Sequence, residues 1–202
     1  MTAAAGPGSE EIPRMTHKFA ELAFTPAVRE IQERMGSRKA YAKGEGGPVH
    51  HDRLGPAEAA FIATRDSFYM ASVSETGWPY IQHRGGPAGF VKILDERTLG
   101  FADFRGNRQY VSLGNLTGND RVSLFFMDYA RQGRLKLLGH ARAVAIEGQP
   151  KLMERLAMPD YTARIERAFL ISVEALDWNC SQHITPRFTP DEIAAAVAYS
   201  RE

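Results

Sequence analysis

Two kinds of hydrophobic pattern divide this chain of 202 residues. Near the start, a Thr-Pro pair at residues 25–26 precedes apolar residues at helical spacing, which predicts one amphipathic helix ended by Gly36. Residues 56–64 are rich in alanine and predict a second helix, and residues 151–158 and 191–200 predict two more. These helical patterns lie mainly toward the two ends of the chain.

Between them, the chain changes to short apolar and aromatic runs bounded by turn residues, a pattern typical of β-strands. Such runs occupy residues 68–74, 78–84, 90–94, 98–102, 121–128, 134–146 and 168–176. Short strands joined by tight turns, with helices mainly outside them, predict an antiparallel sheet closed into a barrel or a sandwich.

Composition and charge narrow the class of protein. The chain is 44% hydrophobic and 24% charged with a formal net charge of +1, which is typical of a soluble globular protein and does not indicate a nucleic-acid surface. No run approaches the roughly 18 apolar residues of a membrane span. The single cysteine, Cys180, cannot form an internal disulfide. Residues 1–14, rich in small residues, Gly and Pro, are not expected to anchor to a core and lack a signal-peptide pattern, so we expect a cytoplasmic protein.

The stretch of residues 99–116 is the strongest candidate for chemistry. Its apolar strand ends at Ala102 and Asp103, and after a polar turn a segment opens with Asn107, Arg108 and Gln109. We expect a helix to begin at this segment. A helix N-terminus carries unpaired backbone N–H groups and a partial positive charge, and a cationic side chain beside it can clamp a phosphate. The stretch therefore predicts a site for a phosphorylated ligand.

Three further motifs accompany this stretch. A strand ends at Arg84, Arg131 and Gln132 precede a later strand, and Trp178 and Arg187 stand near the C-terminus. In this order the four motifs resemble the pyridoxamine 5′-phosphate oxidase superfamily, the FMN-binding split barrels. The resemblance implies a mainly β fold, a six-stranded antiparallel split β-barrel with peripheral helices.

The resemblance covers about residues 54–188 and implies a division of the chain. We expect an N-terminal extension of residues 1–50, an FMN-binding split-barrel domain of residues 51–190 and a C-terminal helical tail of residues 191–202.

The resemblance also implies an FMN pocket, and the chemistry of the residues agrees with it. FMN carries a doubly charged phosphate and a flat ring with donors and acceptors along its edge. Arg84 and Arg108 can supply a cationic clamp, Asn107 and Gln109 can add neutral donors, and Gln132 offers a donor and an acceptor to the ring edge. The expected cofactor-binding residues are Arg84, Gly85, Ala102, Asp103, Asn107, Arg108, Gln109, Arg131, Gln132, Trp178, Gln182, His183 and Arg187.

Several of these residues also have plain structural interpretations. Gly85 belongs to a loop with three glycines that lets backbone N–H groups approach a ligand or simply forms a sharp turn. Arg84 can be a charge on a sheet rim, and Trp178 can be a core or interface aromatic. His183 stands near Cys180, but no third ligand or orienting acid lies at useful spacing, so we predict no metal site and assign no catalytic residue.

The assembly and activity follow from the resemblance. It implies a homodimer with the flavin at the subunit interface, to which Trp178 and Arg187 reach from the neighbouring subunit, and a flavin-dependent oxidoreductase. Pyridoxamine 5′-phosphate oxidases carry an Arg-x-His pair where this chain has QHITPR at residues 182–187, so pyridoxamine phosphate is not the expected substrate. We expect another small molecule, or reduction of the flavin by NAD(P)H. The alternatives are a flavin-binding module without turnover, and a barrel that binds a deazaflavin or a haem-related ligand.

Overall fold

A computed structural model describes residues 16–45, 48–178 and 182–199 of the chain. The chain divides into two compact units, Met1–His50 and His51–Glu202, and each is described by itself. Residues 1–14, which the composition predicts to be unanchored, and Cys180 lie outside the described residues.

The first unit contains short helices and a two-stranded parallel sheet. The strands are β1 (Thr16–His17) and β2 (Val49–His50), and the helices are α1 (Lys18–Ala23), α2 (Pro26–Arg34), α3 (Arg38–Tyr41) and the 3-10 helix η1 (Ala42–Gly44). Helix α2 is the predicted one, and the Thr25 side chain accepts the backbone N–H of Val28 at 3.4 Å. The prediction of a single helix missed α1 and α3, because six and four residues are too few for apolar periodicity to show.

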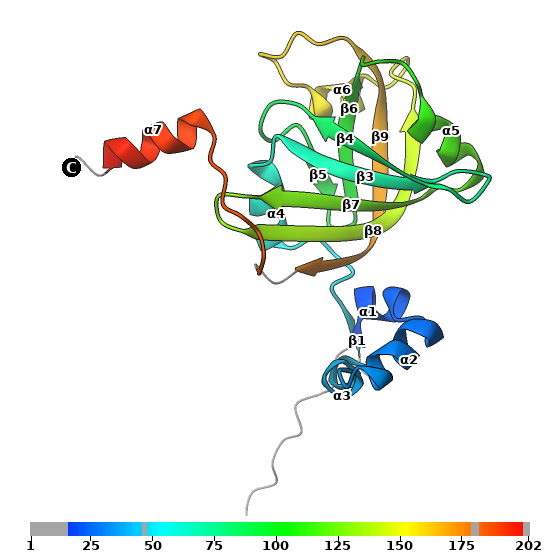
Figure 1. Cartoon of the computed structure of the whole chain (residues 1–202). Coiled ribbons are helices and arrows are strands. Elements are labelled where there is room, and N and C mark those ends of the chain that lie inside the picture. The colour runs from blue at the N-terminus through cyan, green and yellow to red at the C-terminus, as the bar shows by residue number, and fades with distance from the viewer. Residues whose placement is uncertain (1–15, 46–47, 179–181, 200–202) are drawn as a thin grey trace, which may run out of the picture. The chain divides into compact units, whose positions relative to one another are not determined.

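The second unit is built on one antiparallel sheet in the order β4-β3-β7-β8-β9-β6-β5 (Figure 1). Its strands are β3 (Ser67–Val73), β4 (Pro79–Gly85), β5 (Lys92–Asp95), β6 (Thr98–Phe104), β7 (Arg121–Asp128), β8 (Gly133–Val144) and β9 (Ile165–Trp178). The antiparallel, mainly β split-barrel fold is confirmed. The sheet has seven strands where the resemblance implies six, because the short edge strand β5 also pairs with β6.

Helices surround this sheet at its periphery. They are α4 (Pro56–Ala63), α5 (Val111–Gly118) and α6 (Pro150–Leu156), and α7 (Pro190–Tyr199) follows near the end of the chain. Helices α4, α6 and α7 match the predictions for residues 56–64, 151–158 and 191–200 to within two residues at each end. Glu58 caps α4, because its Oε2 accepts the backbone N–H of Gly55 at 2.9 Å.

Aromatic side chains fill the inside of the curled sheet. Phe68 of β3 stacks on Phe126 of β7 with 4.8 Å between ring centroids, and it meets Phe101 of β6 edge-on at 5.3 Å. Phe101 stacks in turn on Phe169 of β9 at 5.3 Å, and none of the four residues is more than 1% exposed. Strands β3 and β6 are not neighbours in the sheet, so the contact between Phe68 and Phe101 shows that the sheet curls around this core.

A bulge bends the two longest strands. The register of β8 against β9 shifts between Leu138 and Gly139, so that β9 carries one extra residue there. Bulges of this kind increase the local twist and bend of a strand, which helps the sheet to curl. Gly139 is required at this point, because a Cβ on it would lie 2.3 Å from the carbonyl oxygen of Ser172.

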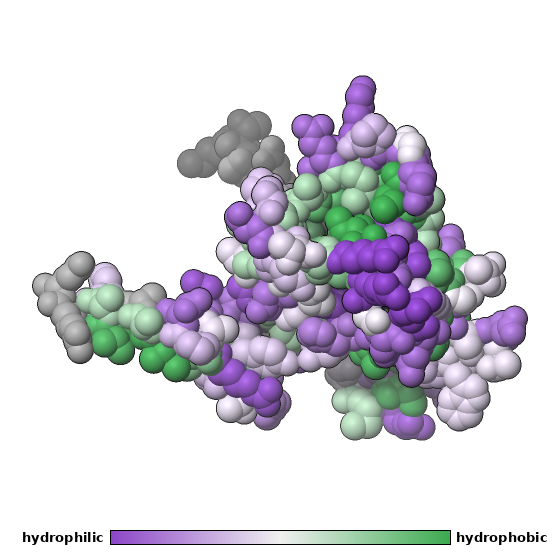
Figure 2. Space-filling model, turned by 90° about the horizontal axis from the view of Figure 1, so that it is seen from above, coloured by the Kyte–Doolittle hydropathy of each residue, from purple (hydrophilic) through white to green (hydrophobic). Residues whose placement is uncertain are grey.

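The surface mixes polar and apolar residues. Seen from above, strongly hydrophilic side chains gather in a cluster right of the centre of the view, and hydrophobic side chains lie above and beside it (Figure 2). Within the described ranges, no helix is both long and apolar enough to cross a membrane.

Candidate functional site

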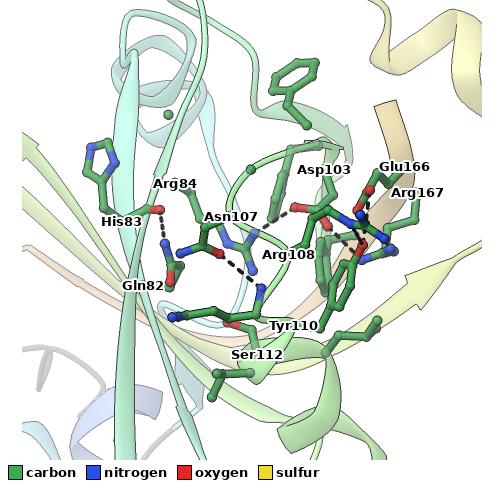
Figure 3. A pocket seen from close by; sticks show the side chains of 18 of the residues that line it. Gln82, His83, Arg84, Asp103, Asn107, Arg108, Tyr110, Ser112, Glu166 and Arg167 are labelled. Atoms are coloured by element: carbon green, nitrogen blue, oxygen red, sulfur yellow. Dashed lines mark hydrogen bonds and ion pairs between the residues drawn. The ribbon is translucent and has the colours of Figure 1, made fainter. Parts of the chain in front are cut away.

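A cavity of about 230 Å³ lies beside strand β4. Its walls come from β4, β6, the loop after β6, the first turn of α5 and the start of β9 (Figure 3). Seven of the predicted cofactor-binding residues line it, namely Arg84, Gly85, Ala102, Asp103, Asn107, Arg108 and Gln109. Phe90, Phe101 and Phe169 also line it, so the cavity combines charged groups with an aromatic wall.

Strand β4 supplies a polar row to this cavity, because side chains alternate across a strand. Tyr80, Gln82 and Arg84 are half-buried and line the cavity; the exposed His83 also belongs to the lining, but its ring points away from Gln82 and Arg84 (Figure 3). The Tyr80 hydroxyl donates to the side-chain oxygen of Gln82, and the Gln82 amide donates to the backbone oxygen of His83 at 3.2 Å. Arg84 is the last residue of this row and adds a guanidinium to the cavity lining.

The loop between β6 and α5 places Asn107, Arg108 and Gln109 in an irregular conformation. Asn107 Oδ1 accepts the backbone N–H of Gln109 at 3.1 Å, and Arg108 and Tyr110 are left-handed with φ of 63° and 54°. The prediction that a helix begins at Asn107 is wrong, since α5 begins at Val111. Left-handed residues cannot continue a right-handed helix, and each costs about 1–2 kcal/mol outside glycine.

Arg84, Asp103 and Arg167 form one largely buried ion-paired group, which we call the Arg-Asp-Arg triad. Arg84 Nη1 lies 2.7 Å from Asp103 Oδ1, and Arg167 Nη1 lies 3.2 Å from Asp103 Oδ2. The Arg84 guanidinium also lies 5.0 Å from the centroid of the Phe169 ring, within cation–π distance. Burial raises the pKa of Asp103 and lowers the pKa of Arg84, in each case against the attraction of the opposite charge.

Arg108 is the exposed arginine of the cavity and is held by Tyr110. Its Nε donates to the Tyr110 hydroxyl at 3.2 Å, and that hydroxyl donates to Glu166 Oε1 at 3.2 Å. The hydrogen bond to Tyr110 raises the pKa of Arg108. The ring of Tyr110 lies 5.0 Å from the guanidinium carbon of Arg167, so the loop contacts the Arg-Asp-Arg triad.

The other six predicted residues do not line this cavity; they are Arg131, Gln132, Trp178, Gln182, His183 and Arg187. Gln132 lies in the turn between β7 and β8, and its side-chain amide donates to the backbone oxygen of Ile184 at 2.5 Å. The Arg187 guanidinium lies 5.1 Å from the centroid of the Tyr129 ring in the same turn. Gln182 and His183 are exposed. These contacts fix the segment after β9 against the turn between β7 and β8.

Trp178 is held by a buried carboxylate. Its indole Nε1 donates to Glu58 Oε1 at 2.6 Å, its ring meets that of Phe61 edge-on at 4.9 Å, and Glu58 is only 8% exposed. An unpaired buried carboxylate or indole N–H would be costly, so this bond links α4 firmly to the end of β9.

Arg131 is held by a second buried carboxylate, that of Asp128. Asp128 accepts the backbone N–H of Arg131 at 2.9 Å and pairs with the Arg131 and Arg65 guanidinium groups at 3.2 and 2.8 Å. Burial acts to raise the pKa of Asp128, but the backbone hydrogen bond and the two arginine charges outweigh it, so the pKa is lowered.

Sequence reasoning missed Arg167, Tyr80 and Gln82. The signal for Arg167 was the alternation of β9, where the buried Phe169 stands two residues later and so shares a face with it. Alternation along β4 likewise places Tyr80 and Gln82 on the same face as Arg84.

The fold and the cavity together define a split-barrel protein with a cationic, aromatic-walled site. Residues 54–179, more than half of the chain, match the family described as pyridoxamine 5′-phosphate oxidase. The chain therefore belongs to this family. No curated protein matches the chain.

Solved structures include several similar chains. An FMN-binding protein from Syntrophomonas wolfei subsp. wolfei has a TM-score of 0.47 at 12% identity, covering 76% of this chain and 95% of its own. HupZ from Group A Streptococcus has a TM-score of 0.46 at 16% identity, covering 67% of this chain and 100% of its own. The haem storage protein HutZ from Vibrio cholerae has a TM-score of 0.42 at 17% identity, covering 62% of this chain and 94% of its own.

Proposed function

We propose that the chain is an FMN-binding flavoprotein that holds the phosphate of FMN between Arg84, Asn107 and Arg108. The observation that carries the proposal is the convergence of three arginines and two carboxylates on one cavity, which leaves a net charge of +1. The first turn of α5 also lines the cavity, and a helix N-terminus adds about half a positive charge and unpaired N–H groups. A phosphate monoester with a charge of about −1.5 to −2 fits this environment.

The residues of the cavity also fit the rest of such a ligand. Arg84 Nε is buried and has no hydrogen-bond partner among the described residues, and a buried unpaired donor costs about 1–3 kcal/mol. A polar ligand bound beside Arg84 can lower that cost. The row of Tyr80 and Gln82 offers hydrogen bonds to the hydroxyls of a ribityl chain.

The size of the cavity supports a site completed by a second copy of the chain. Pockets for small ligands usually measure about 300–1,000 Å³, so a cavity of about 230 Å³ suits the ribityl phosphate and leaves the ring at its mouth. In the proposed homodimer, two equivalent sites form and each ring is covered by the partner. The residues proposed to reach the partner's flavin are Trp178, Gln182, His183 and Arg187, and Arg131 and Gln132 remain proposed contacts of the flavin ring.

The proposed activity is an oxidoreductase reaction on a small molecule, with NAD(P)H as a candidate electron donor. Bound FMN supplies the hydride and electron transfer, and the chain binds its phosphate and orients its ring. No side chain is needed as a nucleophile.

The absorption spectrum of the purified protein tests the cofactor. Flavin bands, or their appearance on addition of FMN, are the expected result. A band at shorter wavelength would indicate a deazaflavin instead, and haem bands a haem-related ligand. A colourless protein that takes up no FMN would refute the proposal.

Two arginines of one loop test the phosphate site. Arg108 lines the cavity, whereas Arg105 does not and lies 3.9 Å from Glu166. Arg108→Ala should weaken FMN binding roughly tenfold or more, the value of a charge-assisted hydrogen bond, and Arg105→Ala should not. Equal losses in flavin fluorescence titrations would count against a specific role for Arg108.

Anaerobic addition of NADH or NADPH then separates an enzyme from a passive flavin-binding module. Bleaching of the flavin bands is expected. A bound flavin that no donor bleaches would favour the module.

A further inference from the structure

One ion pair connects strands that are not neighbours in the sheet. Arg84 lies on β4, at one edge of the sheet, and Asp103 lies on β6, next to the strand at the opposite edge. Their 2.7 Å contact therefore spans the open side of the barrel. Both side chains are largely buried there, at 17% and 11% exposure, so the contact is shielded from solvent.

Asp103 does not simply cancel the charge of Arg84, because it also pairs with Arg167. The two arginines use separate carboxylate oxygens, at 2.7 and 3.2 Å. Arg167 stands directly opposite Asp103 in the register of β6 and β9, and its Nη2 pairs with Glu166 at 3.2 Å. The Arg-Asp-Arg triad by itself carries one net positive charge, and Glu166 beside Arg167 balances it; these four residues line the same cavity (Figure 3).

We propose that Asp103 and Arg167 are positioning residues of the phosphate site. Asp103 fixes the guanidinium of Arg84 against the Phe169 ring, and Arg167 holds the second oxygen of Asp103, so that this carboxylate is divided between two arginines and does not pair with Arg84 alone. The inference rests on the proposed FMN function, because it concerns the affinity of the same cavity for a phosphate.

Comparison of FMN with riboflavin, which lacks the phosphate, isolates this role. The measured quantity is the affinity for FMN divided by the affinity for riboflavin, each obtained from quenching of flavin fluorescence. A residue that only supports the fold changes both affinities together, whereas a positioning residue of the phosphate site changes the ratio.

Asp103→Asn gives the sharpest result, because a role through net charge and a role in positioning Arg84 predict opposite changes of the affinity ratio. Removing a negative charge from an anion site would raise the ratio if net charge alone mattered. Positioning predicts instead that the ratio falls roughly tenfold. A ratio that rises or stays the same would overturn the inference.

Arg167 is tested by two substitutions. Arg167→Gln leaves Asp103 to neutralise Arg84, so the ratio should fall roughly tenfold. Arg167→Lys keeps the charge and serves where the Gln variant does not fold, but one ammonium cannot bridge both Asp103 and Glu166 as the guanidinium does. We expect its ratio to fall roughly threefold, and an unchanged ratio would overturn the inference.

A control and the unmodified protein complete the experiment. Asp120→Asn removes an exposed carboxylate that pairs with His140 outside the cavity, and it should keep the ratio of the unmodified protein. If the unmodified protein does not prefer FMN to riboflavin, the proposed phosphate site fails. If it does, and the Asp103 and Arg167 variants keep its ratio, only the inference fails.

Discussion

Replacing Gly139 by alanine is expected to damage the fold at the bulge between β8 and β9. The new Cβ would lie 2.3 Å from the carbonyl oxygen of Ser172, whereas real Cβ atoms essentially never approach another heavy atom within 3.0 Å. The obstructing atom belongs to the backbone of β9, so no side-chain rotation relieves the clash. The two strands must separate, and the hydrogen bonds between them must lengthen.

The cost can be estimated from these two effects. Overpacking a well-packed interior costs about 1–3 kcal/mol, and each backbone hydrogen bond lost or weakened adds about 0.5–1.5 kcal/mol. With one or two such bonds affected, Gly139→Ala should lower the free energy of unfolding by about 2–5 kcal/mol. This is a large part of the roughly 5–15 kcal/mol available to a domain.

Urea unfolding followed by circular dichroism measures this loss, and Gly100→Ala is the matched control. The three heavy atoms nearest to a Cβ on Gly100 would be methyl carbons of leucine side chains, at 3.0–3.1 Å, and these can shift. The control should lose only about 1 kcal/mol, the lower end of the range for overpacking. If Gly139→Ala unfolds at the same urea concentration as Gly100→Ala, the argument from backbone contact is refuted.

The pKa of Asp128 is lower in the folded protein than in the unfolded chain, where it is about 3.9. Asp128 therefore contributes stability that is fully present above the unfolded pKa and is lost as the pH falls through the folded pKa. Asp128→Asn should lack this loss, so the difference in free energy of unfolding between the variant and the unmodified protein, measured with urea, should narrow below about pH 4. A constant difference would contradict a stabilising role for the charged Asp128. Glu58→Ala leaves the N–H groups of Trp178 and Gly55 unpaired and should cost about 2–4 kcal/mol in thermal unfolding. Glu58→Gln keeps an acceptor oxygen and should cost less, and equal losses would show that these hydrogen bonds do not stabilise the fold.

The fold could be predicted from the sequence because its signals are local. Strands β3 and β4 show short aromatic and apolar runs on either side of a compact turn at residues 74–78, and such a pattern has few alternatives. Thr25 and Pro26 predicted the start of helix α2, because Thr is a common N-cap and Pro is common at the first helical position. The short helices α1 and α3 gave no comparable signal, because each spans fewer than two turns.

The site was predicted less completely, because its geometry depends on contacts distant in sequence. The composition of residues 107–109 indicated an anion site, but nothing in it reveals that Arg108 and Tyr110 adopt left-handed conformations, which are uncommon outside glycine. The pairing of Asp103 with Arg167 depends on the register of β6 against β9. Local patterns do not determine that register.

The Arg-Asp-Arg triad serves the fold and the cavity together, and this explains why charged residues occupy a place where apolar ones would suffice for packing. Exchanging a buried ion pair for apolar residues is often neutral or stabilising. Burial raises the pKa of Asp103 and lowers that of Arg84, so burial opposes the charged form of both groups. Such costs concentrate at sites where charge meets a ligand. Because Arg84 meets Asp103 only when β4 and β6 approach each other, the cationic wall of the cavity depends on the curling of the whole sheet.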